Sequence, residues 1–247
     1  MAKYDYIAGK RRIVEILENR LEVIDSNELP SEESFTYSNS YTSWITAIFV
    51  DIRKSLDLFS NEDKVLVSKV IRSFTSEVIE IFRKSDNLRE IGVRGDCVYA
   101  MFTTPSKDDI LDVADMAFYA NTFMTMLNEL LEEHDLPSIR VGIGLSAAKD
   151  LVVKAGRKDT GINSMVWIGE SATKASKLSG VGNKGGYAPI VLSSTTYSNI
   201  IDALVKGNGD IARSWFSRHY DAELGTFYGA NIIKTGFNEW IQSGMKE

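Results

Sequence analysis

The sequence predicts an α+β domain in which helices cover one face of a mostly antiparallel sheet. Three observations lead to this prediction. An apolar run rich in β-branched residues, 45–50, has the composition of a buried strand. Residues 88–102 contain two short strand-like runs on either side of Gly95, which predict a hairpin. Two long stretches, 61–84 and 106–134, carry apolar residues at helical spacing.

The N-terminal region is predicted to lie outside this domain. Residues 9–25 place apolar side chains at helical spacing among lysine, arginine and glutamate, so we expect an amphipathic helix. We expect this helix to pack on the core, because amphipathic faces usually pack within their own fold, and the alternative is pairing with a partner helix. Residues 25–43 contain turn-forming asparagine, proline and serine and predict an exposed connection. We therefore expect an N-terminal helix and connection over residues 1–43, followed by one domain over residues 44–247.

Polar residues mark the starts of the two long helices. Asn61 is the predicted N-cap of the first helix and Ser106 that of the second. The second helix is expected to end before Pro137, because proline cannot continue a helix. In the next strand, from Ile139 to Ser146, apolar residues alternate with glycine and polar residues, a pattern typical of a half-buried strand.

The remainder of the chain continues the alternation of strands and helices. A basic, glycine-containing loop follows the strand, and a helix is expected to begin after Gly169. Further along, the pattern predicts a strand over 190–192, a helix over 195–206 and a hairpin within 215–233.

Composition restricts the class of function. The chain has 247 residues, of which 44% are hydrophobic and 25% charged, as in ordinary soluble globular proteins. The net charge of −6 argues against a nucleic-acid surface, which is usually basic. The sequence has no signal-peptide pattern and no apolar run of membrane-spanning length. The single cysteine, Cys97, cannot form an intramolecular disulfide, so we expect a cytoplasmic protein without nucleic-acid or membrane partners.

Two carboxylates end elements that we expect to be neighbours. Asp51 directly follows the buried strand, and Asp96 lies at the tip of the hairpin. If the strands are adjacent, the two side chains converge, and oxygen ligands together with phosphates are what Mg²⁺ or Mn²⁺ requires. Taken singly, Asp51 could cap a turn and Asp96 could serve only the hairpin. Taken together, they predict a metal site.

Four segments in this order resemble the catalytic core of the class III nucleotidyl cyclases, the adenylyl and guanylyl cyclase family. They are the strand ending in Phe-Val-Asp-Ile, the Gly-Asp hairpin, the strand at 139–146 and the glycine-then-helix segment at 166–178. The resemblance covers about residues 40–195 and implies the family's palm-like, ferredoxin-like fold. It also implies a reaction in which the 3′ hydroxyl of a nucleoside triphosphate attacks its own α-phosphorus and releases pyrophosphate.

The resemblance assigns roles to individual residues. Asp51 and Asp96, with the backbone carbonyl of Ile52, would hold two Mn²⁺ or Mg²⁺ ions per site. Arg157 and Lys158, in the basic loop, match the place where the family carries a phosphate-binding arginine. The alternative for this pair is ordinary solvated surface.

The helix after Gly169 departs from the family in two positions. Thr173 and Lys177 stand where the family typically has the asparagine and arginine that orient the ribose and stabilise the pentavalent phosphorus. They are four residues apart and therefore lie on the same face of the helix. Lysine offers a point charge where arginine offers a planar fork. The resemblance thus implies either an enzyme with altered geometry or a catalytically inactive, nucleotide-sensing pseudo-cyclase.

The base-reading positions also differ from those of purine cyclases. Gly92 and Val166 stand where purine cyclases place polar side chains, so the family's hydrogen bonds to adenine or guanine cannot be made by these residues. A glycine would widen the site unless another group fills it. We expect Arg94, or an aromatic residue such as Tyr41 or Trp44, to fill this space and meet the base edge. For Arg94 the alternative is a salt bridge within the hairpin.

These departures, with the metal pair intact, resemble the pyrimidine cyclases of the bacterial Pycsar anti-phage systems. The resemblance implies conversion of UTP to 3′,5′-cyclic UMP and pyrophosphate, a second messenger that a separately encoded effector reads. Conversion of CTP to cyclic CMP is the first alternative and an unusual adenylate cyclase the next. In this family the metal residues and the Thr173–Lys177 face come from different chains, so a homodimer with two composite sites is expected.

Overall fold

The computed structural model describes the chain in five stretches, which are residues 3–55, 57, 60, 63–157 and 160–246. The chain divides into two compact units, residues 1–43 with 151–168 and residues 44–150 with 169–247. Two long strands, β2 (Asn39–Ile52) and β5 (Val141–Arg157), contribute residues to both units. The division into an N-terminal region of 1–43 and one domain of 44–247 stays a prediction.

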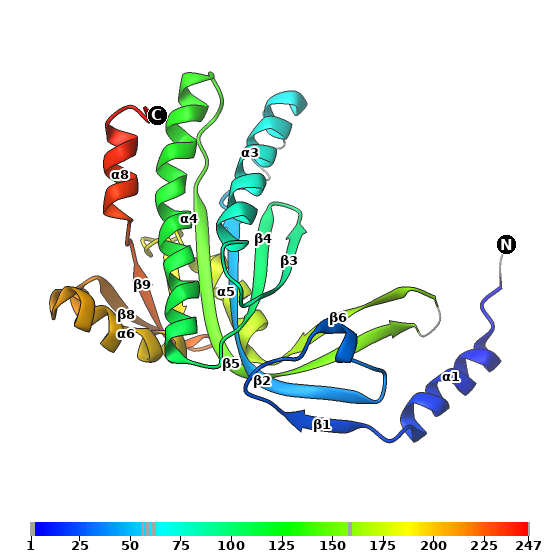
Figure 1. The fold of residues 1–247 in the computed structure, drawn as a ribbon. Coiled ribbons are helices and arrows are strands. Elements are labelled where there is room, and N and C mark those ends of the chain that lie inside the picture. Colours follow the sequence, from blue (N-terminus) through cyan, green and yellow to red (C-terminus); the bar gives the residue numbers. More distant parts are fainter. Residues whose placement is uncertain (1–2, 56, 58–59, 61–62, 158–159, 247) are drawn as a thin grey trace. The chain divides into compact units, whose positions relative to one another are not determined.

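The larger unit holds most of the helices and strands (Figure 1). Besides its parts of β2 and β5 it contains α3 (Lys64–Phe82), β3 (Leu88–Arg94), β4 (Cys97–Thr103), α4 (Lys107–Glu133), α5 (Glu170–Val181), β7 (Ile190–Ser193), α6 (Ser194–Asn208), α7 (Ile211–Ser214), β8 (Phe216–Asp221), β9 (Gly225–Ala230) and α8 (Thr235–Gln242). The strand order is β3-β4-β2-β5-β7-β9-β8. Strand β4 is antiparallel to β2 and β3, and β9 is antiparallel to β7 and β8, whereas β5 and β7 are parallel. The predicted α+β fold with a mostly antiparallel sheet is confirmed.

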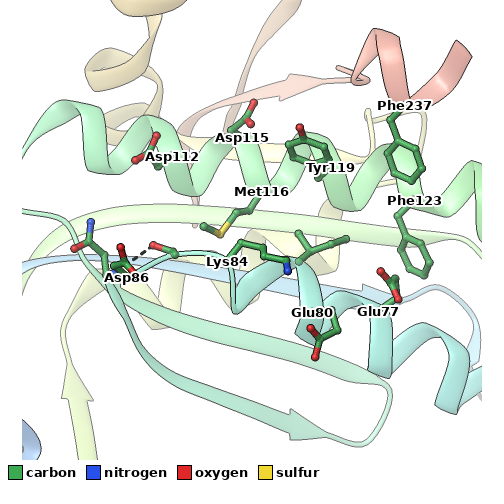
Figure 2. A pocket seen from close by; sticks show the side chains of 13 residues that line it. Glu77, Glu80, Lys84, Asp86, Asp112, Asp115, Met116, Tyr119, Phe123 and Phe237 are labelled. Atoms are coloured by element: carbon green, nitrogen blue, oxygen red, sulfur yellow. Dashed lines mark hydrogen bonds between the residues drawn. The ribbon is translucent and has the colours of Figure 1, made fainter. Parts of the chain in front are cut away.

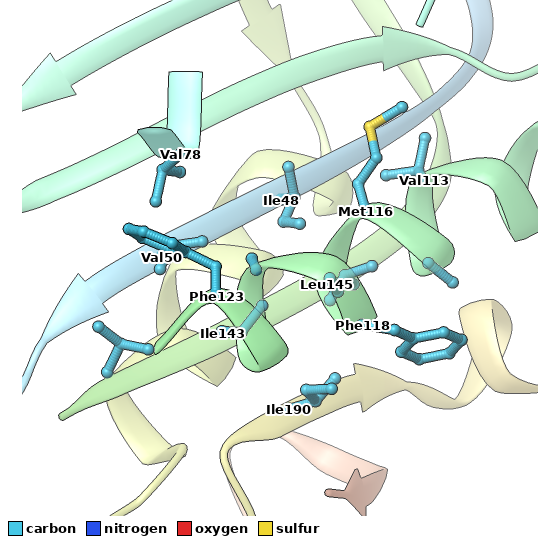
Figure 3. Close-up of a cluster of buried hydrophobic side chains, with 14 of the residues drawn as sticks. Ile48, Val50, Val78, Val113, Met116, Phe118, Phe123, Ile143, Leu145 and Ile190 are labelled. Carbon is cyan, nitrogen blue, oxygen red and sulfur yellow. The ribbon is translucent and has the colours of Figure 1, made fainter. Parts of the chain in front are cut away.

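The main core lies between one face of this sheet and helices α3, α4 and α6 (Figure 3). Alternate residues of the strands point into it, such as Ile48 and Val50 of β2. The facing helices contribute residues one turn apart, such as Phe74 and Val78 of α3. Burial of these apolar side chains fixes which face of each strand points inward, and with it the position of Asp51.

The starts of the two long helices test the predicted caps. Ser106 caps α4 as expected, in a capping box in which its hydroxyl accepts a hydrogen bond from the Asp109 N–H at 3.2 Å. Helix α3 begins later than predicted, because the side chain of Asp63 accepts a hydrogen bond from the Val65 N–H at 2.7 Å. Asn61, the predicted cap, lies outside the described residues.

Helix α5 packs on the opposite face of the sheet, so helices lie on both faces and not on one face as predicted. This packing also changes the interpretation of the glycines in β5. A Cβ atom on Gly142 would lie 2.1 Å from the carbonyl oxygen of Ser179, and one on Gly144 would lie 2.1 Å from that of Ala175. Both glycines are buried, so the prediction of a half-buried strand here is wrong. The glycines instead permit close approach of α5 to the sheet.

The smaller unit contains α1 (Tyr6–Glu18), β1 (Glu22–Asp25), a 3₁₀ turn (Glu32–Ser34), β6 (Ile162–Ile168) and parts of β2 and β5. Strand β1 is parallel to β2, and β6 is antiparallel to β5. The apolar side chains Ile13, Ile16 and Leu17 of α1 are 58%, 64% and 78% exposed. The packing of this helix on the core stays a prediction. None of the helices in the described part of the chain has the length and apolar character that a membrane crossing requires.

Candidate active site

Two rows of residues cross strands β2, β4 and β3 on the face opposite the main core. The charged row consists of Asp51, Cys97 and Arg94, which lie directly opposite one another in the ladder. The aromatic row consists of Phe49, Tyr99 and Gly92. Because residues two apart in a strand point to the same face, the rows are neighbours, about 7 Å apart along the strands. Together the two rows form a surface with charged side chains on one side and aromatic rings on the other.

The hairpin brings the two predicted carboxylate ligands to the end of β2. Gly95 adopts the left-handed conformation, with φ of 62°, that turns the chain between β3 and β4. The Ile52 N–H donates a hydrogen bond to the backbone carbonyl of Asp96 at 3.3 Å, which places Asp96 beside the segment that carries Asp51. The Ile52 side chain is buried in the main core and so anchors this backbone. The structure therefore brings Asp51, Ile52 and Asp96 together.

The electrostatics of this cluster favour a cation. Burial raises the pKa of Asp51, the guanidinium of Arg53 offsets part of this rise, and the negative charge of Asp96 adds to it. Two neighbouring carboxylate side chains are a suitable donor set for a divalent ion, which would offset their negative charge. Cys97, between Asp51 and Arg94, is an unsuitable nucleophile, since burial and both carboxylates raise the pKa of its thiol to about 12.

Arg53 is a residue that sequence reasoning did not identify. Its Nη2 donates to the Oδ2 of Asp51 at 2.6 Å, and its side chain is only 15% exposed. The same guanidinium donates to backbone carbonyls of Ser179 and Gly180 in α5. These acceptors lie more than a hundred residues away in sequence, so no local pattern predicted the contact.

Tyr99 corrects the expectation of a widened site at Gly92. A Cβ atom on Gly92 would lie 2.2 Å from the ring of Tyr99, so the tyrosine fills the space that the missing side chain leaves. The ring stacks on Phe49 with centroids 5.2 Å apart, and its hydroxyl donates to Glu90 at 2.8 Å. Burial and the bond to Glu90 raise the pKa of Tyr99.

The three residues that were expected to fill this space, Arg94, Tyr41 and Trp44, have other surroundings. Arg94 is exposed and, among the described residues, forms no ion pair, which disfavours the hairpin salt bridge. Trp44 is 36% exposed, and Tyr41 packs edge-on against Phe35 at 4.7 Å. The expectation that Arg94, Tyr41 or Trp44 occupies the space beside Gly92 is therefore wrong, while a role for Arg94 at the base edge stays a prediction.

Helix α5 presents Thr173 and Lys177 to solvent. Ala175 and Leu178 face the sheet and are fully buried, whereas Thr173 and Lys177 lie on the exposed side. The ammonium of Lys177 pairs with Glu223 at 2.6 Å, with side chains 48% and 73% exposed. A pair this exposed contributes little to stability, so Lys177 can readily exchange its partner.

A buried carboxylate holds the other end of α5. Asp150, only 1% exposed, accepts hydrogen bonds from the backbone N–H groups of Glu170 and Ser171 at 3.0 and 3.1 Å and from the Ser171 hydroxyl. A negative charge at the first turn of a helix complements its unpaired N–H groups and its dipole. Asp150 and Arg53 thus fix opposite ends of the helix that carries Thr173 and Lys177.

Three predicted substrate-binding residues belong to the smaller unit or lie outside the described chain. Arg157 is exposed at the end of β5, where it lies opposite Ile162. Val166 is 37% exposed in β6. Lys158 lies outside the described residues. Their roles stay predictions.

A separate pocket of about 900 Å³ lies between α3, α4 and α8. Figure 2 shows its aromatic side chains Tyr119, Phe123 and Phe237 and the acidic side chains around them. Among the predicted site residues that the structure describes, none lines it. We therefore place the candidate active site on the two rows and not in this pocket.

Comparison with known proteins identifies the family. The model for the adenylate and guanylate cyclase catalytic domain matches residues 37–207. The chain is 54% identical over 243 residues to the uridylate cyclase of Treponema porcinum, across 98% of this chain and 82% of that protein. It is 26% identical over 248 residues to the uridylate cyclase of Gulbenkiania mobilis, across 97% and 96% of the two. Its fold matches the crystal structure of the adenylyl cyclase CyaB from P. aeruginosa with a TM-score of 0.62 at 18% identity, covering 77% of this chain and 95% of that one.

Proposed function

This chain belongs to the adenylate and guanylate cyclase catalytic domain family, and we propose that it converts UTP to 3′,5′-cyclic UMP and pyrophosphate. The observation that carries the choice of a pyrimidine is Tyr99, whose ring fills the space beside Gly92 and leaves less room for a two-ring base. The two relatives named uridylate cyclases support uracil over cytosine.

The cluster of Asp51, Ile52 and Asp96 at the end of the charged row fits a divalent metal. Asp51 and Asp96 would hold Mn²⁺ or Mg²⁺, with the carbonyl of Ile52 as a further oxygen ligand. Within the described ranges no three or more His, Cys, Asp or Glu side chains gather as a metal cage, so substrate phosphates and water would complete the coordination. Two bound ions would supply a lowered pKa for the 3′ hydroxyl and charge neutralisation on the phosphates.

The neighbouring rows suggest how the nucleotide is oriented. Phosphates at the charged row would leave the base at the aromatic row, where the Tyr99 ring, supported by Phe49, limits its size. Arg94, which lies in the charged row two residues after Gly92, would meet the base edge, and the cations Arg157 and Lys158 would bind the phosphates. In this arrangement charged groups would meet the phosphates, and aromatic groups would meet the base.

The exposed face of α5 would complete the site of a second chain. Thr173 would hydrogen-bond the ribose, and Lys177, released from Glu223, would stabilise charge at the reacting phosphorus. In a twofold homodimer this gives two equivalent composite sites. We also propose that cyclic UMP serves as a second messenger in anti-phage defence, made in the cytoplasm where UTP is available and read by a separately encoded effector.

The test is a competition assay with the full chain. Purified protein is incubated with equimolar ATP, GTP, CTP, UTP and Mn²⁺, and the cyclic products are identified by mass. We expect cyclic UMP to predominate. Predominance of cyclic CMP would reassign the base, and a preference for ATP would contradict the pyrimidine assignment while sparing the cyclase one. Absence of any cyclic product from protein that binds nucleotides would indicate a pseudo-cyclase.

A further inference from the structure

We infer that Arg53 is a positioning residue that joins the metal ligand Asp51 to helix α5, which carries the transition-state groups. The inference rests on the proposed function for the roles of Asp51 and α5, and on the contacts of the guanidinium for the connection itself. Arg53 lies two residues after Asp51, where the chain leaves β2.

The guanidinium contacts both partners at once. Towards β2, Nη2 donates to the carboxylate of Asp51 at 2.6 Å and Nε donates to its backbone carbonyl at 3.3 Å. Towards α5, Nη2 donates to the carbonyl of Ser179 at 2.8 Å and Nη1 to that of Gly180 at 3.1 Å. A planar fork with five N–H donors can span such a set of acceptors, which a lysine ammonium cannot.

The contacts of Arg53 supply hydrogen-bond donors to backbone carbonyls at the C-terminal end of α5. The last carbonyls of a helix lack intrahelical donors, and the helix dipole places partial negative charge there. The last turn of α5 contains no basic residue of its own. Arg53 supplies that positive charge from a neighbouring strand.

The same contacts constrain the carboxylate of Asp51. Arg53 engages Oδ2, and among the described residues Oδ1 accepts no hydrogen bond, so Oδ1 remains available to a cation. Gly142 preserves this arrangement, because a Cβ atom there would lie 2.9 Å from Nη2 of Arg53. Hydrogen-bonding partners of metal-ligating carboxylates fix their orientation, and their loss typically weakens metal binding about 10- to 100-fold.

The connection has a consequence for the dimer. In composite sites, Asp51 serves one site while α5 of the same chain serves the other. Arg53 therefore links the geometry of the two sites through a single side chain.

The test uses the full chain without nucleotide, so it does not depend on UTP turnover. Arg53→Gln removes the charge and the fork, and Arg53→Lys retains the charge alone. Arg140→Gln is the matched control, since exposed Arg140 bonds to Asn183 at 3.0 Å just beyond α5 and does not contact the Asp51 side chain. Mn²⁺ affinity is measured by electron paramagnetic resonance, and hydrogen exchange of α5 amides by mass spectrometry.

For Arg53→Gln we expect about a 10- to 100-fold weaker Mn²⁺ affinity and at least about tenfold faster exchange in the last turn of α5. For Arg53→Lys we expect a smaller loss of Mn²⁺ affinity with the same acceleration of exchange. Arg140→Gln should change neither. Wild-type Mn²⁺ affinity or wild-type α5 exchange in Arg53→Gln, or equal losses in Arg140→Gln, would overturn the inference. If Arg53→Gln does not fold, Arg53→Lys decides by the exchange measurement.

Discussion

The two halves of the proposed catalytic machinery are built differently within one chain. Asp51 is half-buried at the end of a core strand and fixed by a guanidinium that is itself largely buried. Lys177 lies on the exposed side of α5, where it pairs with the more exposed Glu223. The metal half is thus pre-organised by the chain's own contacts, while the transition-state half presents its groups outward. This difference suits a site in which a second chain delivers Thr173 and Lys177.

Removing a carboxylate from the proposed metal site should lower the cyclisation rate more than any other change considered below. Asp96→Asn keeps the size of the side chain but removes a proposed metal ligand, so we expect cyclisation to fall about a thousandfold or more. Rates with Mn²⁺ and UTP check this, with circular dichroism to confirm folding. Asp202→Asn, at an exposed surface pair with Arg213, is the control and should remain active. Substantial turnover by folded Asp96→Asn would refute the metal assignment.

A change in the aromatic row should alter selectivity more than rate. Tyr99→Ala opens the space beside Gly92, so we expect the preference for UTP over ATP to fall about tenfold or more. Tyr99→Phe keeps the ring, loses only the hydroxyl bond to Glu90 and should retain the preference. The ratio of kcat/KM values for the two nucleotides measures the effect. Unchanged selectivity in Tyr99→Ala would show that the ring does not limit base size.

Loss of the ion pair between Lys177 and Glu223 should change the activity only weakly. Glu223→Gln frees Lys177 from an exposed partner, so we expect kcat/KM to rise by less than about threefold. Because salt screens exposed charges, the difference from wild type should shrink between about 0.05 and 0.5 M salt. Activity at the two salt concentrations measures this. A tenfold loss of activity would mean that Glu223 itself takes part in the site.

Local patterns were enough to predict the elements that carry the metal half. The apolar run before Asp51 and the hairpin around Gly95 each determine their own structure, and the four segments that resemble the cyclase family set their order. The conformation of the tip and the pairing of β2 with β4 then place both carboxylates together.

Long-range contacts could not be predicted in the same way. The alternation of apolar residues with Gly142 and Gly144 is the same whether the glycine face of the strand meets water or a closely packed helix. In the structure this face packs against helix α5. Tyr99 covers Gly92 only because of the strand register, which no single segment contains. Arg53 follows a strand like an ordinary surface charge, and its acceptors in α5 become neighbours only on folding.

The composite site is tested most directly by mixing two inactive variants. Asp51→Asn lacks a proposed metal ligand, and Lys177→Ala lacks the lysine proposed to stabilise the transition state. If each site takes Asp51 from one chain and Lys177 from the other, a heterodimer of the two variants has one intact site. With equal amounts and random pairing, half of the dimers are mixed and each has one working site of two, which predicts recovery of about a quarter of wild-type cyclic UMP formation. Native mass spectrometry would verify that heterodimers form. No recovery with heterodimers present would contradict a site shared between chains.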